Sequence, residues 1–464
     1  MDIYDLPGGQ NNNENRLPPI NQLPLEILTE IFFHSLANGA IKQNRGNSVD
    51  TSPVVLGHIC RAWRTLALSS PLLWATINVT VMTGWGVLVD VDRTLLAVEE
   101  LLIRSQDCPL KIAMRYVHYP YGPDEEDSHS FRIRYEAIVA KLLSHSHRWK
   151  HVELSLPKAS VGAVFERISA GTPLLTYFLI AESQNTTESM TINLSSATQL
   201  ECLRILLPVR IDWGGSMMHK MRKFSSISYP TVYAFLECFD RCPSLTDFYF
   251  HSHMQRPSPH FTRTQMSLRR LSYLVNCSLE HLYQAQYSAM LNWLDLPSLR
   301  NFSLSTTEVP SDPSTLERFL LRSQPPLEVF SIFVRGMTNP ELHACLRIVP
   351  SLTTLRCATI HFTEESVEAF MVPPPPDGES VLCPNLESVW INNESEVACR
   401  AIAKLMVNRR RNALTTGAAR VRVFGLDPGN FEAFKGYPGI QQCVDEGLQL
   451  RDKFWWHDHR DSNK

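Results

Sequence analysis

Apolar residues recur along this chain with two different periods, one typical of helices and one typical of strands. In the first helical stretch they lie three or four positions apart, as on one face of a helix: Leu25, Leu28, Phe32 and Leu36. Ile27 and Ile31 form a second apolar line beside that face. A short helix with two apolar lines can bury one of them and offer the other to a partner.

Proline and serine residues indicate where this helix and two further ones begin. Pro24 suits the first helical position, where a missing N–H costs nothing, and Glu26 lies near the positive end of the helix dipole. A Ser-Pro pair at 52–53 opens a second predicted helix, and another at 70–71 opens a very short third one that ends near Trp74. The second helix carries its own apolar and aromatic set: Leu56, Ile59, Cys60, Trp63 and Leu66.

After residue 75 the pattern alternates between strand and helix. Strands are predicted over 76–81 and 110–114, helices over 91–105 and 131–146, and a loop over 118–130. From Trp149 onward a frame recurs in which an apolar residue is followed by two others, three and five positions later. Its copies are Trp149/Val152/Leu154, Leu175/Phe178/Ile180, Leu200/Leu203/Ile205, Leu245/Phe248/Phe250, Leu268/Leu271/Tyr273, Leu299/Phe302/Leu304, Leu327/Phe330/Ile332, Leu352/Leu355/Cys357 and Leu386/Val389/Ile391. Helices are predicted between copies over 161–170, 231–241, 316–322, 342–348 and 398–407.

One short strand and one helix in roughly 25 residues resembles a leucine-rich repeat. The regular repeat places Asn or Cys eight positions after its first Leu, and here only Asn276 fits that rule, so the resemblance is to a degenerate form. Residues 213–224 predict an irregular unit, because Gly214-Gly215 breaks any helix there. Each unit needs a neighbour to bury its apolar strand face, so we expect an α/β solenoid with parallel strands. A compact α/β domain is the alternative.

The N-terminal three-helix pattern resembles the F-box. Its residues are most similar to those of the F-box proteins of mushroom-forming fungi. The matching residues are Leu23, Pro24, Glu26, Ile27, Leu28, Ile31 and Phe32, followed by Ile59, Cys60, Trp63, Leu66, Pro71, Leu73 and Trp74. The sequence departs from the family pattern at 38–51, a polar loop longer than the usual turn between the first two helices. The alternative is an ordinary helical subdomain in which Trp63 and Trp74 are core aromatics.

This resemblance implies a substrate receptor of a Skp–cullin–F-box-type ubiquitin ligase. The helices would bind a Skp-type adaptor, the repeat domain would bind an unknown target protein, and a cullin-RING ligase would supply ubiquitin transfer. The implied adaptor-binding residues are Leu23, Pro24, Glu26, Ile27, Leu28, Ile31, Ile59, Cys60 and Trp63. Ile59 and Trp63 could instead hold the helices together. The alternatives are an F-box scaffold that acts without a ligase and an enzyme built on a plain α/β domain.

Length and composition bound the remaining possibilities. With 464 residues, 44% of them hydrophobic, the chain can bury a sizeable core. Its net charge of −3, with both signs mixed throughout, gives no electrostatic basis for binding nucleic acid or membrane. We expect no secretory signal and no transmembrane helix, and therefore a cytoplasmic or nuclear protein. The predicted organisation is a disordered tail over 1–16, an F-box over 17–78, a solenoid over 79–450 and a C-terminal tail over 451–464.

No familiar catalytic motif is found, so we expect no enzyme activity and no cofactor. The weak metal-like patterns are His457-Asp458-His459, His145/His147 and His251/His253, and none has enough further ligands to predict a metal site. The eleven cysteines are scattered, which favours reduced thiols, and Cys238 and Cys242 lack a second pair to complete a zinc site.

A basic cluster, Arg409-Arg410-Arg411, is predicted to end a helix, where cations complement the helix dipole. A nuclear localisation signal is the alternative interpretation of this cluster.

Overall fold

The computed structural model describes residues 20, 23–39, 48–49, 52–83, 91–118, 125–182, 190–228, 232–252, 268–358, 367–371, 381–392, 396–416, 418–426 and 428–451. The chain divides into two compact units: unit 1 is Met1–Arg167 with Gly171–Leu175, and unit 2 is Ile168–Ala170 with Thr176–Lys464. The predicted tail over 1–16 lies outside the described residues, as does 452–464. Within the described part of the chain, no helix is both long enough and apolar enough to cross a membrane.

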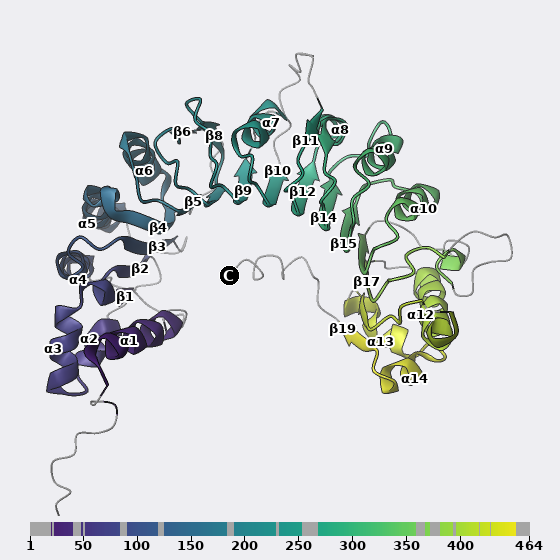
Figure 1. Cartoon of the computed structure of the whole chain (residues 1–464), viewed down its shortest axis with the longest axis horizontal. Helices are drawn as coiled ribbons and strands as arrows, with labels where there is room; N and C mark the ends of the chain where they lie inside the picture. The colour runs from purple at the N-terminus through teal and green to yellow at the C-terminus, as the bar shows by residue number, and fades with distance from the viewer. Residues whose placement is uncertain are drawn as a thin grey trace, which may run out of the picture. The chain divides into compact units, whose positions relative to one another are not determined.

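Unit 1 begins with helices and continues into parallel strands. Its elements are α1 (Leu25–Gly39), β1 (Ser48–Val49), α2 (Ser52–Gly57), α3 (Arg61–Ser69), the 3-10 helix η2 (Pro71–Trp74), β2 (Thr76–Thr83), α4 (Val91–Arg104), β3 (Leu110–His118), α5 (Glu125–Ser144), the 3-10 helix η3 (Ser146–Arg148), β4 (Trp149–Leu156) and most of α6 (Lys158–Ala170). β2, β3 and β4 pair in parallel in that order, and β1 pairs antiparallel with β2. Helices α4 and α5 lie on one side of these strands (Figure 1).

Two sequence predictions for unit 1 are wrong in detail. The second predicted helix is two helices, α2 and α3, because the chain turns after Gly57 and Cys60 becomes an extended N-cap whose Sγ accepts a hydrogen bond from the Trp63 N–H at 3.4 Å. Helix α5 starts at Glu125, inside the predicted loop over 118–130.

Unit 2 continues the strand–helix alternation. Its elements are β5 (Tyr177–Glu182), β6 (Met190–Asn193), β7 (Cys202–Leu206), β8 (Val209–Asp212), β9 (Lys223–Ser228), α7 (Val232–Arg241), β10 (Asp247–Ser252), β11 (Arg269–Arg270), β12 (Asn276–Leu282), α8 (Gln284–Trp293), β13 (Leu294–Asp295), β14 (Asn301–Thr306), α9 (Ser314–Ser323), β15 (Val329–Phe333), α10 (Asn339–Ile348), β16 (Thr354–Ala358), β17 (Ser388–Asn392), α12 (Glu396–Thr416), β18 (Val423–Leu426), α13 (Pro428–Lys435), α14 (Ile440–Asp445) and β19 (Gln449–Arg451).

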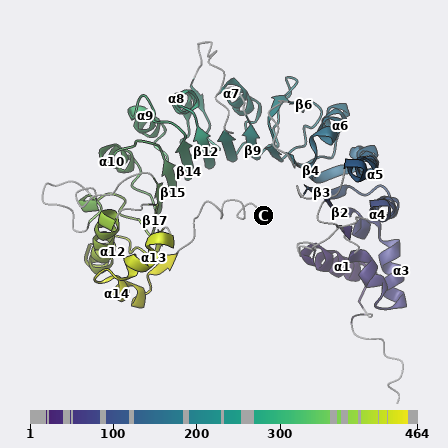
Figure 2. The same ribbon diagram turned by 180° about the vertical axis from the view of Figure 1, so that it is seen from behind.

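The strands of unit 2 form one parallel sheet in the order β5-β7-β9-β10-β12-β14-β15-β16-β17-β18-β19, while β6/β8 and β11/β13 form separate two-stranded pairs. Helices α7, α8, α9 and α10 lie along one face of this sheet in both views (Figures 1 and 2). The architecture is therefore α/β, with parallel strands alternating with helices as in a leucine-rich-repeat-like solenoid, as the sequence predicts.

Apolar side chains of successive strands stack in rows beneath these helices. Phe302 lies beside Phe330 with ring centroids 5.8 Å apart, and Phe224 lies beside Phe248 at 5.6 Å. Phe302 also contacts Phe319 of α9, so this row joins the sheet to the helices. Each strand residue of the row is the second apolar residue of its repeat, which explains why the frame is visible in the sequence.

The frame predicted at Leu268/Leu271/Tyr273 is wrong. Leu268 and Tyr273 are exposed, whereas the buried residues that align with the neighbouring repeats are Leu274, Cys277 and Leu279. Asn276 was the only residue predicted to occupy the Asn or Cys position of the regular repeat. It does not occupy that position once the frame starts at Leu274. A six-residue shift goes unnoticed in the sequence because Leu268 and Leu271 are also apolar.

Two further repeats were missed. Met221/Phe224/Ser226 supplies β9, which begins at the end of the interval 213–224 where an irregular unit was predicted. Val421/Phe424/Leu426 supplies β18. Ser226 stands where the frame expects an apolar residue, yet it is 4% exposed, and its strand pairs in register with β10. The glycines after Trp213 do form a turn, since Gly214 and Gly215 both have positive φ.

The repeats lack the regular Asn or Cys position, and their backbone groups are paired by other backbone groups and by arginine side chains. At the start of successive strands, two consecutive N–H groups share one carbonyl of the preceding repeat, as when Arg300 and Asn301 both donate to Val275 O at 2.9 and 3.1 Å. Arginine side chains satisfy other carbonyls: the buried Arg148 donates to Cys108 O at 3.0 Å, and the half-buried Arg322 donates to Leu294 O at 2.6 Å. Since these groups are paired, the repeats stack without a regular Asn position.

The basic cluster does not end its helix, because α12 continues to Thr416. Arg409 is fully buried and donates to the carbonyl oxygens of Phe370, Leu382 and Cys383 at 2.7–3.0 Å. Arg410 is also buried, and it donates to the carbonyl oxygens of Val421 and Glu446 at 2.7 Å. Burial lowers the pKa of Arg409 to about 10. Two of the three arginines therefore hold loops in place, which argues against a nuclear signal here.

Candidate docking surface and a histidine–glutamate cluster

The nine residues predicted to bind an adaptor fall into two groups in the structure. Leu23, Pro24, Glu26, Ile27, Ile31 and Ile59 are exposed, whereas Leu28 is buried and Cys60 and Trp63 are half-buried. The exposed fractions are 51% for Ile27, 40% for Ile31 and 57% for Ile59, against 3% for Leu28. Leu28 therefore holds the helices together, whereas the six exposed residues, and the accessible parts of Cys60 and Trp63, are open to a partner.

The two apolar lines of helix α1 differ in burial, because only one of them faces the rest of unit 1. Phe32 is 1% exposed and lies against Trp63 of α3, with ring centroids 4.6 Å apart. Ile27 and Ile31 lie on a different side of the same helix and remain exposed. Leu25, which the periodicity placed on the buried line, is 64% exposed because it lies in the first turn.

Several exposed apolar residues of the same helices were not predicted. More than half of the large exposed apolar side chains in the described residues lie between Ile20 and Leu72. Those on α1, α2, α3, η2 and the turns beside them are Leu23, Leu25, Ile27, Ile31, Val54, Val55, Ile59, Leu68 and Leu72, here called the exposed apolar set. The signal that could have revealed the additional members is the shortness of α2: a six-residue helix can bury only one side.

The helices that carry this set are fixed to one another. Arg64 Nε donates to Gly57 O at 2.7 Å, which joins α3 to α2, and Trp74 Nε1 donates to Ala67 O at 2.7 Å, which joins η2 to α3. The Arg104 guanidinium of α4 lies 4.8 Å from the Trp74 ring centroid. These supporting contacts are made by Gly57, Arg64, Ala67, Trp74 and Arg104, none of which belongs to the exposed apolar set. An exposed apolar concentration of this kind is typical of a protein interaction site.

Unit 2 carries a polar surface on the face of the sheet opposite to the helices. Strands β9, β10, β12 and β14 present Lys223, Ser225, Asp247, Tyr249, His251, Asn276, Ser278, Glu280, Asn301 and Ser303, here called the polar face. Neighbouring strands are joined there by side chains: Asn301 Nδ2 donates to Asn276 Oδ1 at 2.5 Å, and Asn276 Nδ2 donates to Asp247 Oδ1 at 2.6 Å. The polar face thus satisfies many of its own hydrogen bonds.

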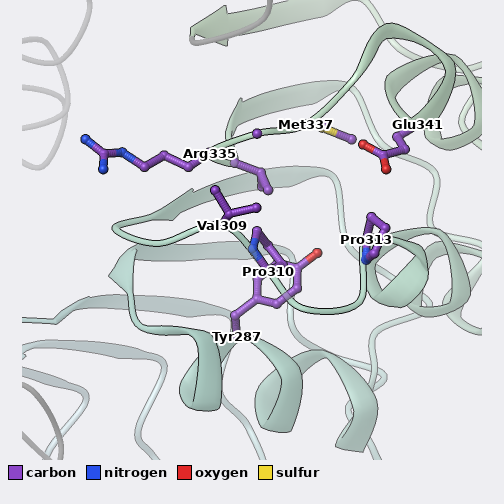
Figure 3. A pocket seen from close by; sticks show the side chains of 9 residues that line it. Tyr287, Val309, Pro310, Pro313, Arg335, Met337 and Glu341 are labelled. Carbon is purple, nitrogen blue, oxygen red and sulfur yellow. The ribbon is translucent and has the colours of Figure 1, made fainter.

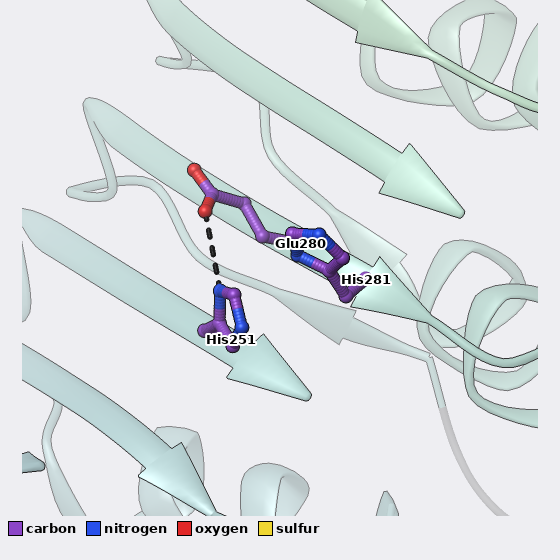
Figure 4. A group of neighbouring side chains, drawn as sticks. All are labelled: His251, Glu280 and His281. Carbon is purple, nitrogen blue, oxygen red and sulfur yellow. Dashed lines mark hydrogen bonds and ion pairs between the residues drawn. The ribbon is translucent and has the colours of Figure 1, made fainter. Parts of the chain in front are cut away.

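At the end of the polar face, His251, Glu280 and His281 form a compact cluster (Figure 4). His251 Nδ1 lies 3.4 Å from Glu280 Oε2, and the ring centroids of His251 and His281 are 4.4 Å apart. Burial opposes ionisation of Glu280, but hydrogen bonds from His251, Tyr249 and Ser278 outweigh it and lower the pKa of this carboxyl. Burial and the nearby His251 lower the pKa of His281.

Sequence reasoning paired His251 with His253, which lies outside the described residues, and missed Glu280 and His281. Of the other metal-like patterns, His457-Asp458-His459 also lies outside the described residues. His145 and His147 stack with ring centroids 6.3 Å apart. Among the described residues, they do not belong to a group of three ligating side chains. All eleven cysteines carry free thiols, and Cys238 and Cys242 are both buried.

A small pocket in unit 2 offers little room for a ligand. It is lined by Tyr287, Val309, Pro310, Pro313, Val334, Arg335, Gly336, Met337 and Glu341 (Figure 3). Its cavity of about 30 Å³ has room for about one or two water molecules. Burial raises the pKa of the Tyr287 hydroxyl at its base, so this group stays protonated at neutral pH. The exposed apolar set is therefore the stronger functional candidate.

Comparisons with known proteins add no relative to this picture. A scan against models of protein families finds no match to the chain, and a search of curated proteins finds none either.

Proposed function

We propose that this chain is the substrate-recognition subunit of a Skp–cullin–F-box-type ubiquitin ligase. Its N-terminal helices would dock on a Skp-type adaptor, and the repeats of unit 2 would bind a target protein. The observation that carries the proposal is the exposed apolar set, which lies on the helices whose sequence resembles an F-box. Helix-in-groove recognition uses apolar anchors three or four positions apart, as Ile27 and Ile31 are.

The presence of one buried and one exposed apolar line on α1 supports this function. Leu28 and Phe32 bury the line that stabilises unit 1, so Ile27 and Ile31 are available to a partner without unfolding the helix. Complete burial of an isoleucine side chain contributes roughly 1.5–3 kcal/mol, so a few such residues can supply much of a micromolar affinity. The polar face and its surroundings in unit 2 offer hydrogen-bonding groups to a target.

The direct experiment measures binding of a purified Skp-type adaptor to the full chain by isothermal titration. The test variant is Ile27→Asp with Ile31→Asp. Each new carboxylate would have to lose its water in an apolar contact, so we expect at least a 100-fold loss of affinity, equivalent to about 2.7 kcal/mol. Both positions are exposed, and therefore the variant should fold as the wild type does.

A matched control is available in the same unit. Ile103 on α4 and Ile133 on α5 are 71% and 55% exposed, and the double change Ile103→Asp with Ile133→Asp repeats the same chemistry away from the N-terminal helices. We expect this control to bind the adaptor as tightly as the wild type. No binding by the wild type, or equal losses in both double variants, would refute docking through α1.

A second measurement separates a ligase subunit from an F-box scaffold. The adaptor complex is mixed with a cullin-RING core, and co-elution is followed by size-exclusion chromatography. A ligase receptor should co-elute with both the adaptor and the cullin, whereas a scaffold should co-elute with the adaptor alone.

A further inference from the structure

We propose that His251, Glu280 and His281 form a binding site for one divalent transition-metal ion of the zinc type. The ligating atoms of these three side chains lie within 4.8 Å of one another. Two imidazoles and one carboxylate are a donor set that zinc accepts in proteins, with a further position left for water or another donor. This inference concerns unit 2 only and does not depend on adaptor docking.

Strand register brings the first two ligands together. His251 of β10 is the direct neighbour of Glu280 of β12 in the parallel sheet, although the two are separated by 29 residues in sequence. The distance of 3.4 Å between His251 Nδ1 and Glu280 Oε2 is close to the spacing of about 3.3 Å that two ligands have around a tetrahedral zinc ion with bonds near 2.0 Å.

An irregular backbone supplies the third ligand. In a regular strand, Glu280 and His281 would point to opposite faces of the sheet, yet both side chains lie beside His251 (Figure 4). The pairing of β12 with β14 shifts between Leu279 and Leu282, and His281 has a left-handed φ of 56°. The His281 N–H is held by Ser305 Oγ at 2.7 Å. Bulges that redirect a side chain in this way are frequent beside functional sites.

Other groups hold the carboxylate in position. Tyr249 OH donates to Glu280 Oε2 at 2.9 Å, and Ser278 Oγ donates to Glu280 Oε1 at 3.1 Å. Metal-binding carboxylates are oriented by such outer hydrogen bonds. Since the ligating atoms lie within 4.8 Å of one another, the imidazole rings would turn toward the ion to bring all three ligands to bonding distance, and both rings are at least partly exposed. The neighbouring thiol, Cys277, is buried among the apolar residues and does not belong to the cluster.

The experiment titrates Zn²⁺ into the full chain with its cysteines kept reduced, and measures stoichiometry and affinity by calorimetry. Co²⁺ then serves as the spectroscopic probe, because nitrogen and oxygen ligands give visible d–d bands without the near-ultraviolet charge-transfer band of a thiolate. We expect one equivalent of each ion to bind, with the d–d bands of a site of low coordination number.

Two variants test ligands, a third tests the tyrosine that orients the carboxylate, and a fourth serves as a control. Glu280→Gln preserves the shape of the side chain, and His281→Asn introduces a residue that tolerates a left-handed backbone, so both should keep the fold. We expect each to weaken Zn²⁺ binding at least tenfold, and Tyr249→Phe to weaken it roughly tenfold through the lost orienting bond. The control is His151→Gln, because His151 and Glu153 form a 3.0 Å pair but do not belong to a described group of three ligands.

The result that overturns the site is specific. Circular dichroism first establishes that the variants keep the wild-type fold. The absence of a stoichiometric ion in the wild type would then refute the proposal, as would wild-type affinity in both Glu280→Gln and His281→Asn. A thiolate charge-transfer band with Co²⁺ would also refute it, because the ion would then be bound by cysteine.

Discussion

The N-terminal helices of unit 1 and the polar face of unit 2 both lie outside the apolar core, but they differ in the side chains that they present. The helices present apolar side chains such as Ile27, Val55 and Ile59, whereas the polar face presents Asp247, Asn276 and their neighbours. The polar face is paired within itself by side-chain hydrogen bonds between strands. The helices leave apolar surface in water, which is unfavourable unless a partner covers it.

This difference follows from the periods of the two structures. Along a strand every second residue faces away from the helices, so a polar residue at such a position does not reduce the apolar area buried in the core. On α1 the buried stripe occupies only part of the circumference, and polar residues could have filled the rest. The presence of isoleucine on an exposed side of α1 is therefore informative, and a polar residue on the sheet is not.

The largest effect should come from the apolar row beneath the helices of unit 2. Phe330→Ala removes a fully buried ring that stacks on Phe302, and we expect a loss of about 3–5 kcal/mol in the free energy of unfolding. Urea unfolding followed by circular dichroism measures it. Tyr273→Ala is the control, since this ring is 68% exposed and its loss should change stability by less than about 0.5 kcal/mol. Equal effects at both positions would contradict the assignment of the core.

A sharper contrast lies within α1. We expect Leu28→Ala to cost about 3 kcal/mol in the unfolding of unit 1, because Leu28 is buried, and Ile31→Ala to change it by less than about 0.5 kcal/mol. Hydrogen exchange of the α1 amides measures local stability. Adaptor affinity should show the reverse order for folded protein, with Ile31→Ala the weaker binder. If Ile31→Ala destabilises α1 as much as Leu28→Ala does, its side chain has a structural role and the comparison fails.

The smallest effect is expected on the polar face. Asn276→Ala removes the hydrogen bonds to Asp247 and Asn301, and we expect a loss of about 1 kcal/mol, since water can replace bonds at a half-buried position. The same urea unfolding experiment detects it. A loss as large as that of Phe330→Ala would mean that this polar row carries the stability of the repeats, and that the face is structural instead of available to a partner.

Much of the fold was predictable because the repeat frame reports local burial. Phe248, Phe302 and Phe330 were assigned to the correct strands, and all three lie in the row beneath the helices. Prediction of repeats from this frame was wrong where residue type does not match burial. Ser226 is buried although it is polar, and Leu268 is exposed although it is apolar. A single sequence cannot reveal such exceptions, because the neighbouring repeats decide them.

The candidate sites were predictable to different degrees. The two apolar lines of α1 follow from helical periodicity alone, and only the choice between them required unit 1 to be folded. The buried arginines were misassigned, because a run of three basic residues is usually a solvated surface, and only the packing of α12 shows that Arg409 reaches loop carbonyls. The metal cluster was missed altogether.

By itself, the sequence determined the alternation of helix and strand, the approximate repeat length and the presence of an amphipathic N-terminal helix with surplus apolar residues. These depend on the period of apolar residues over a few turns or pleats, which neighbouring residues set. Only the tertiary structure decided which apolar line of α1 is buried, which repeat frame is used near Leu274, and that His251 meets Glu280 and His281. The physical reason is that these depend on strand register and on a backbone irregularity, which bring together residues distant in sequence.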